Sequence, residues 1–425
     1  MDAPVKPPFR HIEWMKRDIE CIDRPDGTKI LRSRVPLEPF APHIPWHLRR
    51  WASETPDLVW LAQRRGPDRQ WRKVTYAEAM RTVDSLTQAL LDMGLGQDRP
   101  LAILSGNSLE HALMTQAAMQ ARVPAAPISP AYSLMSQDHA KLKYIFNLIR
   151  PGAVMVQDGR LFAKALAALD LAGIRVIHVE NPPPGIESIP YESLAATPVT
   201  GAVAESVAAI TPDTIGKLLF TSGSTGAPKA VKCSSARLAT LGARNLHAMT
   251  SDDVVYNAMP LFHGNALMSA WAPIASVGGA FALRNKFSAS GFLPDIQKFH
   301  ATFFNYVGRS LAYILAQPEQ PAEADNNLRL AWGTEASVRD REEFTRRFGT
   351  PVIESYGSSE GVCVIVCRPN TPRGALGKPD PRFDMIIVDP QGREVPTAQI
   401  GDDGSLRNGA EAIGEIIARG GAARF

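Results

Sequence analysis

The sequence predicts an α/β protein whose sheets are mostly parallel and covered by helices. Apolar runs of strand length alternate with longer stretches of helical period along most of the chain. This alternation is typical of βαβ units, whose right-handed crossovers place helices on both faces of a sheet. After residue 374 the pattern changes to short strands and turns, which predict a small β unit. We therefore expect two αβ lobes and the start of a β subdomain.

The first lobe is predicted at roughly 77–210. Two strands, 58–63 and 71–76, precede an amphipathic helix over 77–93, which ends at Gly94. The strands expected next are LAILSG, APISPAY, GAVMVQ and RVIHVE, with helices at 108–120, after Asp138 and around 161–171 between them. The stretches 181–190 and 195–208 are interpreted as linkers, because prolines or alanines and threonines dominate them.

The second lobe is predicted at roughly 240–350 by the same alternation of strands and helices. Its expected strands are DDVVYNAMPL, GGAFALRN, ATFFNYVG and LRLAWGT. Helices are expected near 266–276, from Ser290 and from Arg309. Ligands in such sheets bind at the carboxyl ends of the strands, so the residues that follow each strand are the candidates for function.

Composition excludes several classes of protein. The 425 residues carry a formal charge of +3 with acids and bases interspersed, so no basic stripe for nucleic acid is expected. No apolar run reaches the length of a membrane span and the start lacks a secretory signal, so we expect a cytoplasmic protein. Four cysteines are too few for a disulfide framework. His43 and His47 share a helical spacing, but Pro45 lies between them, which favours packing or surface roles over zinc.

The stretch LLFTSGSTGAPK, residues 218–229, is rich in glycine and hydroxyl residues directly after an apolar run. Gly223 and Gly226 would let backbone N–H groups approach an anion, and Lys229 adds a positive charge. Hydroxyl donors come from Thr221, Ser222, Ser224 and Thr225. This composition indicates a phosphate cradle, although an ordinary loop has the same composition. Neither the Walker A spacing nor GxGxxG is present, which disfavours a phosphotransfer enzyme of that kind.

The order Thr-Ser-Gly-Ser-Thr-Gly-x-Pro-Lys resembles the signature loop of the adenylate-forming superfamily, which includes acyl- and aryl-CoA synthetases, luciferases and peptide-synthetase adenylation domains. Three further segments resemble family elements in the expected order. They are Pro260-Leu261-Phe262-His263, Gly333-Thr334-Glu335-Ala336 and Tyr356-Gly357-Ser358-Ser359-Glu360, the last with serine in place of the usual threonine. The resemblance implies ATP-dependent activation of a carboxylic acid to an acyl-adenylate, followed by thioester formation with CoA.

The resemblance also implies roles for individual residues. Thr221, Ser222, Thr225 and Lys229 would hold the β- and γ-phosphates, and Glu360 would hold Mg²⁺, to which Thr221 is the second expected ligand. Ser359 would touch the α-phosphate and Tyr356 would lie along the adenine. The remaining nucleotide-site candidates are Gly223, Ser224, Gly226, Gly333, Thr334, Glu335 and Gly357. His263, Val307, Gly308 and Gly333 would line the acyl pocket, with His263 beside the reacting carboxylate.

Structural roles stay open for several of these residues. Glu360 is also consistent with a cap on a surface helix, and Val307 and Gly308 with core packing. For His263 a core position and a role in the chemistry are weighed evenly, with pocket lining favoured. Catalysis by this site is assigned to Glu360, Lys229 and His263.

The two halves of the chain resemble different branches of the superfamily. Up to about residue 235 the segments are similar to feruloyl-CoA synthetases, and from about residue 250 to fatty-acyl and steroid side-chain CoA ligases. We therefore expect a fatty or other bulky apolar acid, with a feruloyl- or coumaroyl-CoA synthetase as the alternative. A small-molecule acid, ATP and CoA are the expected partners, and a homodimer is possible.

The resemblance divides the chain into a large adenylation domain over 1–370, containing the phosphate loop at 218–230, and an incomplete β subdomain over 371–425. The family's small C-terminal domain, which carries a catalytic lysine, is not matched. We expect the isolated chain to be nearly inactive as a ligase. A nucleotide- and acyl-binding module without turnover is the corresponding alternative.

Overall fold

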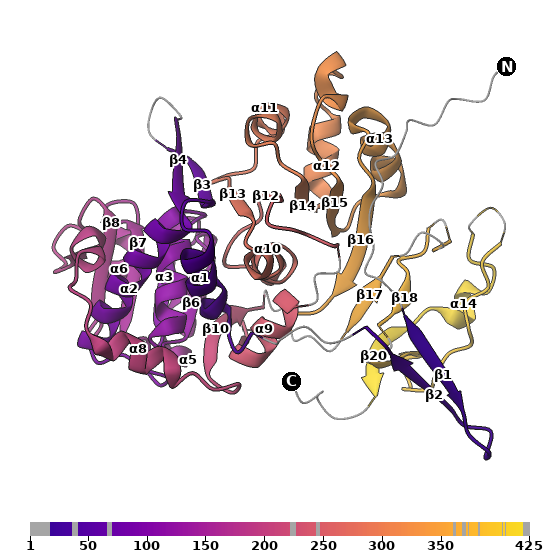
Figure 1. The fold of residues 1–425 in the computed structure, drawn as a ribbon, viewed down its shortest axis with the longest axis horizontal. Coiled ribbons are helices and arrows are strands. Elements are labelled where there is room, and N and C mark those ends of the chain that lie inside the picture. The colour runs from indigo at the N-terminus through magenta and orange to yellow at the C-terminus, as the bar shows by residue number, and fades with distance from the viewer. Residues whose placement is uncertain are drawn as a thin grey trace. The chain divides into compact units, whose positions relative to one another are not determined.

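The computed structural model describes residues 18–35, 41–65, 70–221, 227–243, 247–359, 363–367, 371–372, 374–380, 383–401, 403 and 405–419. They fall into two compact units, which we call the first unit (residues 18–286) and the second unit (residues 287–419). Figure 1 labels the helices and strands of both. The division of the chain into lobes at 77–210 and 240–350 stays a prediction.

A seven-stranded sheet forms much of the first unit, in the order β11-β10-β6-β5-β7-β8-β9. Its strands are β5 Leu101–Leu104, β6 Ala125–Pro127, β7 Ala153–Asp158, β8 Arg175–Glu180, β9 Ile189–Pro190, β10 Ile215–Phe220 and β11 Ala230–Ser234. The recorded pairings are parallel except that of β10 with β11, which is antiparallel. The predicted α/β class with mostly parallel strands is confirmed.

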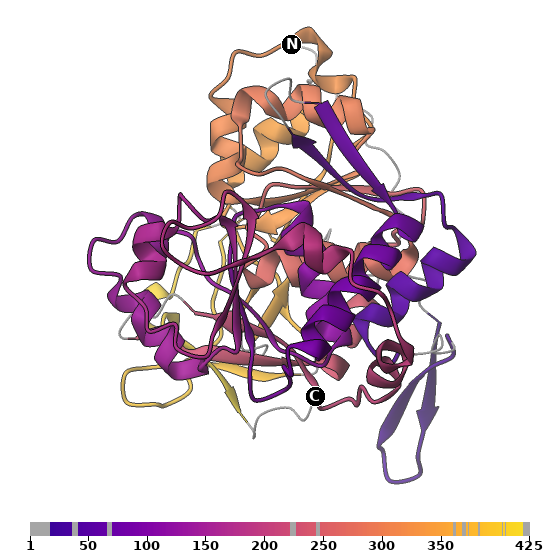
Figure 2. The ribbon, with the colours of Figure 1, turned by 90° about the vertical axis from the view of Figure 1, so that its left-hand side faces the viewer.

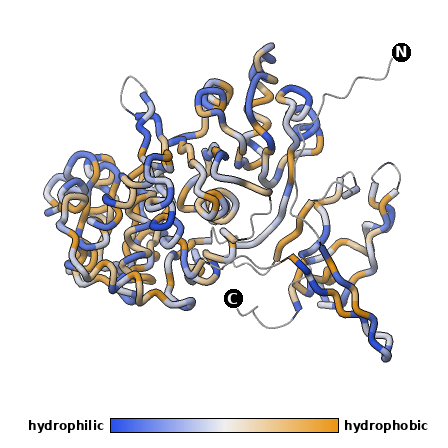
Figure 3. The backbone as a smooth tube through the Cα atoms, viewed as in Figure 1, coloured by the Kyte–Doolittle hydropathy of each residue, from blue (hydrophilic) through white to orange (hydrophobic). Residues whose placement is uncertain are grey.

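Helices cover this sheet on both faces (Figure 2). They are α1 Ile44–Glu54, α2 Tyr76–Asp92, α3 Leu109–Gln120, α4 Ala131–Leu134, α5 Ala140–Ile149, α6 Ala163–Ala167, α7 Tyr191–Ala195, α8 Gly201–Ala208 and α9 Ser235–Ala243. Along them polar and apolar stretches alternate (Figure 3), as amphipathic helices require. The capping box of Thr75 and Glu78 begins α2, and the following Gly94 has the left-handed backbone that ends it (φ 66°).

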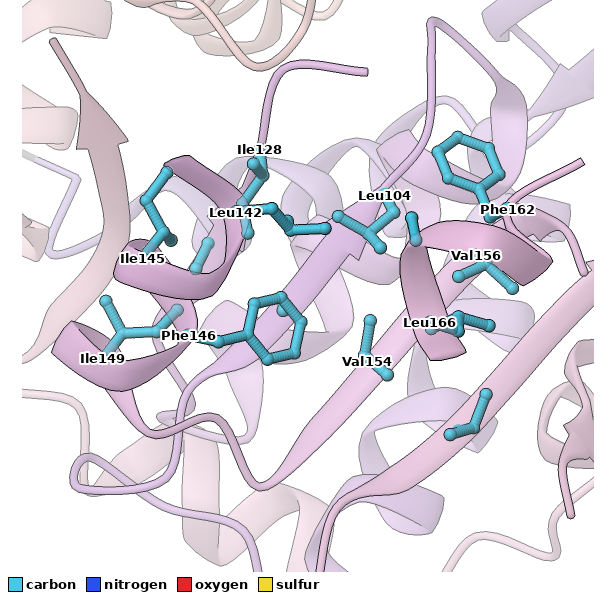
Figure 4. Packing of buried hydrophobic residues seen from close by; sticks show 14 of the residues in the cluster. Leu104, Ile128, Leu142, Ile145, Phe146, Ile149, Val154, Val156, Phe162 and Leu166 are labelled. Carbon is cyan, nitrogen blue, oxygen red and sulfur yellow. The ribbon is translucent and has the colours of Figure 1, made fainter. Parts of the chain in front are cut away.

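Two hydrophobic clusters flank the sheet, because consecutive strand residues point to opposite faces. On one face α5 and α6 bring Leu142, Ile145, Phe146 and Leu166 against Val154 and Val156 of β7 (Figure 4). Leu218 belongs to this cluster, whereas its neighbour Leu219 packs on the other face with Met119 and Leu238. The strand that leads to the glycine-rich stretch is therefore anchored on both of its faces.

A second group of strands in the first unit has the order β12-β13-β3-β4. The strands are β3 Val59–Arg65, β4 Gln70–Thr75, β12 Val254–Asn257 and β13 Ala280–Leu283, and the helices beside them are η1 Ala266–Trp271 and α10 Ala272–Val277. β12, β13 and β3 are parallel, and β4 is antiparallel to β3. Thus β3 and β4 do not join the sheet that follows them in the chain. A separate hairpin consists of β1 Ile19–Asp23 and β2 Lys29–Ser33.

In the second unit, β14 Phe303–Val307, β15 Leu330–Thr334 and β16 Val352–Gly357 run parallel, and β17 Val364–Val366 and β18 Lys378–Pro379 continue antiparallel. The helices are α11 Ala289–Phe299, α12 Gly308–Leu315, η2 Pro321–Ala324, α13 Val338–Phe348 and α14 Gly409–Ala412. The rings of Phe292, Phe304, Phe344 and Phe348 pack against one another in its core. The hairpin of β19 Asp384–Val388 and β20 Glu415–Arg419 fits the predicted β texture after residue 374.

Two expectations differ from the structure. The stretch 195–208, interpreted as a linker, contains α8, because Thr200 caps Ala202 N and the face with Val203 and Ser206 is buried. The helix expected around 161–171 is confined to α6. Among the described residues no cluster of metal-ligating side chains is found, and no helix is both long and apolar enough to cross a membrane.

His43 and His47 are both buried at the start of α1. Nδ1 of His43 accepts a hydrogen bond from Trp46 N (3.1 Å) and so caps the helix. His47 has no hydrogen-bond partner for either ring nitrogen among the described residues. Burial, and secondarily the charge of Arg50, lower the pKa of His47 to about 4. The packing role expected for these histidines therefore carries an electrostatic cost in acid.

Replacing His47 with leucine is expected to reduce the loss of stability in acid. The folded protein keeps His47 neutral between pH 6.5 and about 4 whereas the unfolded chain protonates it, so His47 lowers stability as the pH falls through this window. The cost is about 1.4 kcal/mol per pH unit. Thermal unfolding of His47→Leu and the parent protein at pH 8 and pH 5 measures it. An equal difference at both pH values would contradict the assignment.

Candidate functional site

The two residues that flank the glycine-rich stretch, Thr221 and Lys229, are hydrogen-bonded to each other. Thr221 directly follows β10 and its N–H donates to the carbonyl of Lys229 (3.0 Å), while the N–H of Lys229 lies 3.4 Å from Thr221 Oγ1. The side chain of Lys229 is exposed. Five predicted site residues, Ser222, Gly223, Ser224, Thr225 and Gly226, lie outside the described residues, as does Glu360. The structure thus brings Thr221 and Lys229 together at the carboxyl end of a strand.

His263 lies in the segment that follows β12, and its side chain is exposed rather than packed in the core. The segment turns back on itself, because His263 N donates to Pro260 O (3.0 Å) and Asn265 N donates to His263 Nδ1 (3.2 Å). A neutral His263 would then carry its proton on Nε2.

Asn107, which the sequence did not single out, fixes this segment. Its buried amide donates to Met259 O (2.9 Å) and Arg284 O (3.0 Å), and its Oδ1 accepts from Leu261 N (2.8 Å). Gln63 in turn donates to the carbonyl of Asn107 (2.7 Å). Asn107 follows β5, so one side chain joins the seven-stranded sheet to the ends of β12 and β13. An asparagine three residues after a buried strand was the available sequence signal.

The helix that follows His263 begins as a π-helix, η1. Pro273 lacks an N–H and would clash with the preceding turn of an α-helix, and the N–H of Ala272 instead reaches Leu267 O, five residues back. A wide turn of this kind is frequent at functional sites. Gly264 lies at the start of this region, where a Cβ would be 3.4 Å from Leu219 of β10. The His263 segment therefore lies beside the strand that leads to Thr221.

In the second unit, predicted site residues gather at the carboxyl ends of β14, β15 and β16. Val307 is paired with Thr334, and Gly333 with Glu354, so the segments after these strands share one edge. Tyr356 lies near the end of β16, and it is 43% exposed. Gly357 pairs with Val364 in the hairpin of β16 and β17, and Ser359 lies in its turn.

Two glycines permit close backbone contacts at this edge. A Cβ on Gly308 would lie 1.9 Å from Glu335 O, and one on Gly333 would lie 2.1 Å from Tyr306 O. Glu335 itself has a left-handed backbone (φ 69°), which is unusual for a residue with a side chain and marks local strain. Val307, Gly308, Gly333, Thr334 and Glu335 are thus brought together as one group.

Glu354 and Tyr306 hold the strained turn, and neither was selected from the sequence. The buried carboxylate of Glu354 accepts from Ala336 N (2.7 Å) and from the hydroxyl of Tyr306 (3.0 Å). Burial, and secondarily the charge of Glu354, raise the pKa of Tyr306. The phenol consequently stays protonated and keeps donating to the carboxylate. A glutamate directly after two apolar residues of a predicted strand was the signal that could have identified it.

Comparison with known sequences supports the resemblance. The model of the family described as AMP-binding enzyme matches residues 48–422. The chain is 47% identical over 265 residues to the steroid-22-oyl-CoA synthetase of Rhodococcus jostii (strain RHA1), across 61% of this chain and 46% of that protein. It is 37% identical over 285 residues to the medium/long-chain-fatty-acid–CoA ligase FadD17 of Mycobacterium marinum (strain ATCC BAA-535 / M), across 66% of this chain and 52% of that protein. The chain spans about half the length of these curated relatives.

A solved structure agrees in fold. The benzoate CoA ligase from Burkholderia xenovorans LB400 superposes with a TM-score of 0.71 at 21% identity, covering 84% of this chain and 70% of that one. At this identity the likeness concerns the fold alone, and it confirms the predicted α/β architecture.

Alanine at Gly308 or Gly333 is expected to destabilise the second unit, because the added Cβ meets backbone that cannot rotate away. We expect a loss of at least about 2 kcal/mol. Gly201→Ala is the matched control, because Gly201 has open space around its Cβ position at the start of α8 and alanine there should be neutral or slightly stabilising. Urea unfolding measures all three variants, and equal midpoints for the three would contradict the close contacts at Gly308 and Gly333.

Proposed function

The chain belongs to the AMP-binding enzyme family, and on this premise we propose that it activates a carboxylic acid with ATP as the large domain of an acid–CoA ligase. The observation that carries the proposal is the grouping, within the first unit, of Thr221 and Lys229 at the end of β10 with the His263 segment beside that strand. An anion-binding loop next to an exposed histidine suits a reaction between a phosphate and a carboxylate.

The chemistry requires a carboxylate oxygen to attack the α-phosphorus of ATP in line while pyrophosphate leaves. The two anions repel each other unless positive charge and oriented N–H groups face them. Lys229 would neutralise charge on the leaving β- and γ-phosphates, which Thr221, Ser222 and Thr225 would help to hold. Ser359 would touch the α-phosphate.

Mg²⁺, where bound, would supply further charge neutralisation. Glu360 and Thr221 would hold it, because carboxylate and hydroxyl oxygens are donors that this ion accepts. His263 would orient the acid, and the bond from Asn265 N to its Nδ1 holds the ring in place.

In the second unit the nucleotide would contact the edge formed by β14, β15 and β16. The exposed ring of Tyr356 is suited to stacking along adenine. Glu335 and Thr334 extend from the turn that Glu354 fixes, and Gly308 and Gly333 keep that turn close to β14. CoA as the acceptor of the acyl group, a homodimer and a cytoplasmic location stay predictions.

A bulky apolar acid is the proposed substrate class. The relatives named above are a steroid-22-oyl-CoA synthetase and a medium/long-chain-fatty-acid–CoA ligase, and both names denote extended apolar acids. The hydroxycinnamic acids suggested by the N-terminal half are the competing class.

Substituting Lys229 or Glu360 by alanine is expected to weaken MgATP binding at least about tenfold. The Lys229 variant loses a charge-assisted contact to phosphate, and the Glu360 variant loses a proposed Mg²⁺ ligand. The fold should be unchanged, since the side chain of Lys229 is exposed. Lys232→Ala removes an exposed lysine three residues further on and serves as the control. Titration calorimetry with MgATP measures the effect. Unchanged affinity in both variants would show that the assigned phosphate site is wrong.

Affinity for straight-chain acids should climb with length until the pocket ends. Each buried methylene contributes about 0.8 kcal/mol, or about fourfold in affinity. A series of such acids, compared with ferulate and coumarate by calorimetry in the presence of MgATP, measures this. Tighter binding of ferulate or coumarate than of every aliphatic acid would favour the hydroxycinnamic alternative.

A further inference from the structure

Lys217 is a fully buried lysine in β10, and neither the motif nor the proposed chemistry uses it. Lysine is almost never fully buried unless its charge has a partner, because removing an ammonium from water costs free energy. It precedes Thr221 by four residues on the strand that leads into the glycine-rich stretch. A buried ammonium at this position needs a hydrogen-bond acceptor within the protein.

The partner is the segment that carries His263. The Nζ of Lys217 donates to the carbonyl of Leu261 at 2.9 Å. It also lies 5.9 Å from the ring centroid of Trp271, on η1. Lys217 therefore contacts the chain on both sides of His263.

Leu261 is held at both of its backbone groups. Asn107 Oδ1 accepts its N–H at 2.8 Å, and Lys217 binds its carbonyl. These contacts come from different elements, the loop after β5 and the strand β10, so together they fix the plane of the peptide on each side of Leu261. His263 follows two residues later.

His111 and Cys233, two titratable side chains that interact with Lys217, are uncharged at neutral pH. His111 on α3 is neutral, because burial and then the charge of Lys217 lower its pKa to about 3. Burial raises the pKa of Cys233 on β11 and keeps it a thiol. Burial also lowers the pKa of Lys217 to about 8, which leaves it mainly protonated at pH 7. The bond to Leu261 O is then charge-assisted.

We propose that Lys217 is a positioning residue, which holds the His263 segment at the proposed acyl site through its buried bond to the Leu261 carbonyl. The inference rests on the proposed function in one respect, that His263 faces the acid. The same strand positions Thr221 at the phosphate loop, so β10 ties the acid-side segment to the phosphate-side segment. A shift of one segment relative to the other would misalign the carboxylate and the α-phosphorus.

The test compares Lys217→Met, which keeps the length and removes the donor, with Lys232→Met, which removes an exposed lysine of the neighbouring β11. Amide hydrogen exchange by mass spectrometry is read on peptides covering 259–265 and, for reference, 153–158 in β7. Calorimetry measures the affinity for decanoyl-sulfamoyl-adenosine, a stable mimic of an acyl-adenylate, and for MgATP alone.

For Lys217→Met we expect exchange in 259–265 to accelerate at least about tenfold with 153–158 unchanged. Affinity for the acyl-adenylate mimic should fall at least about tenfold, and MgATP affinity should stay within about twofold. Lys232→Met should match the parent protein in all four readouts. If Lys217→Met does not fold, Lys217→Gln, whose shorter side chain carries no charge, is read in the same way.

Two outcomes would overturn the inference. Unchanged exchange in 259–265 would show that Lys217 does not hold the segment, whatever the function of the protein. Faster exchange with unchanged affinity for the mimic would show that the segment does not face the acid, which refutes the acyl-site role of His263 in the proposed function. Loss of MgATP affinity in the Lys229 and Glu360 variants would still stand in that case, so the two failures are distinguishable.

Discussion

The buried amide of Asn107 is the interaction on which the first unit depends. Its hydrogen bonds to Met259, Leu261 and Arg284 connect the seven-stranded sheet with the ends of β12 and β13. Backbone groups at the ends of buried strands have no ladder partner, and leaving them unpaired would cost free energy. Asn107 binds three of them with one side chain, and Met259 O also accepts from Asn257 Nδ2 (2.8 Å). Because the bonds have direction, they also determine the path of the chain toward His263, which hydrophobic packing alone would not do.

In the second unit, the ends of the strands are held in place by close contacts between backbone segments. Its strand ends are brought together at Gly308 and Gly333, where a side chain would collide with a neighbouring carbonyl. Glu354 then supplies the acceptor that the strained turn at Glu335 and Ala336 needs. The cost of the left-handed residue is offset by a buried, fully used carboxylate oxygen. Both units thus place their candidate residues on turns held by polar side chains from neighbouring strands.

The exposed polar groups of the candidate site are available to a ligand, whereas the buried polar groups hold the protein's own chain. Lys229, His263 and Tyr356 are exposed, as residues that meet a ligand must be. Asn107, Lys217 and Glu354 are buried, and each hydrogen-bonds to the protein's own backbone, Glu354 also to the hydroxyl of Tyr306. A buried polar group that loses its partner is costly, so the buried set restricts where the exposed set can lie.

The sequence by itself determined the α/β class, most of the strands and the order of the motif segments, because these depend on local period and on residues near in the chain. It also proposed Thr221 and Lys229 as site residues, and their hydrogen bonding to each other is local. Only the tertiary structure decided that β3, already paired with β4, also pairs with β13 and not with the seven-stranded sheet, and that 195–208 contains a helix. It alone revealed Asn107, Lys217 and Glu354. Asn107 and Lys217 bind backbone 44 to 177 residues away, and Glu354 bonds to Tyr306, 48 residues away. Composition and hydrophobic periodicity do not indicate which residues far apart in the sequence will bond, so these roles follow from the fold.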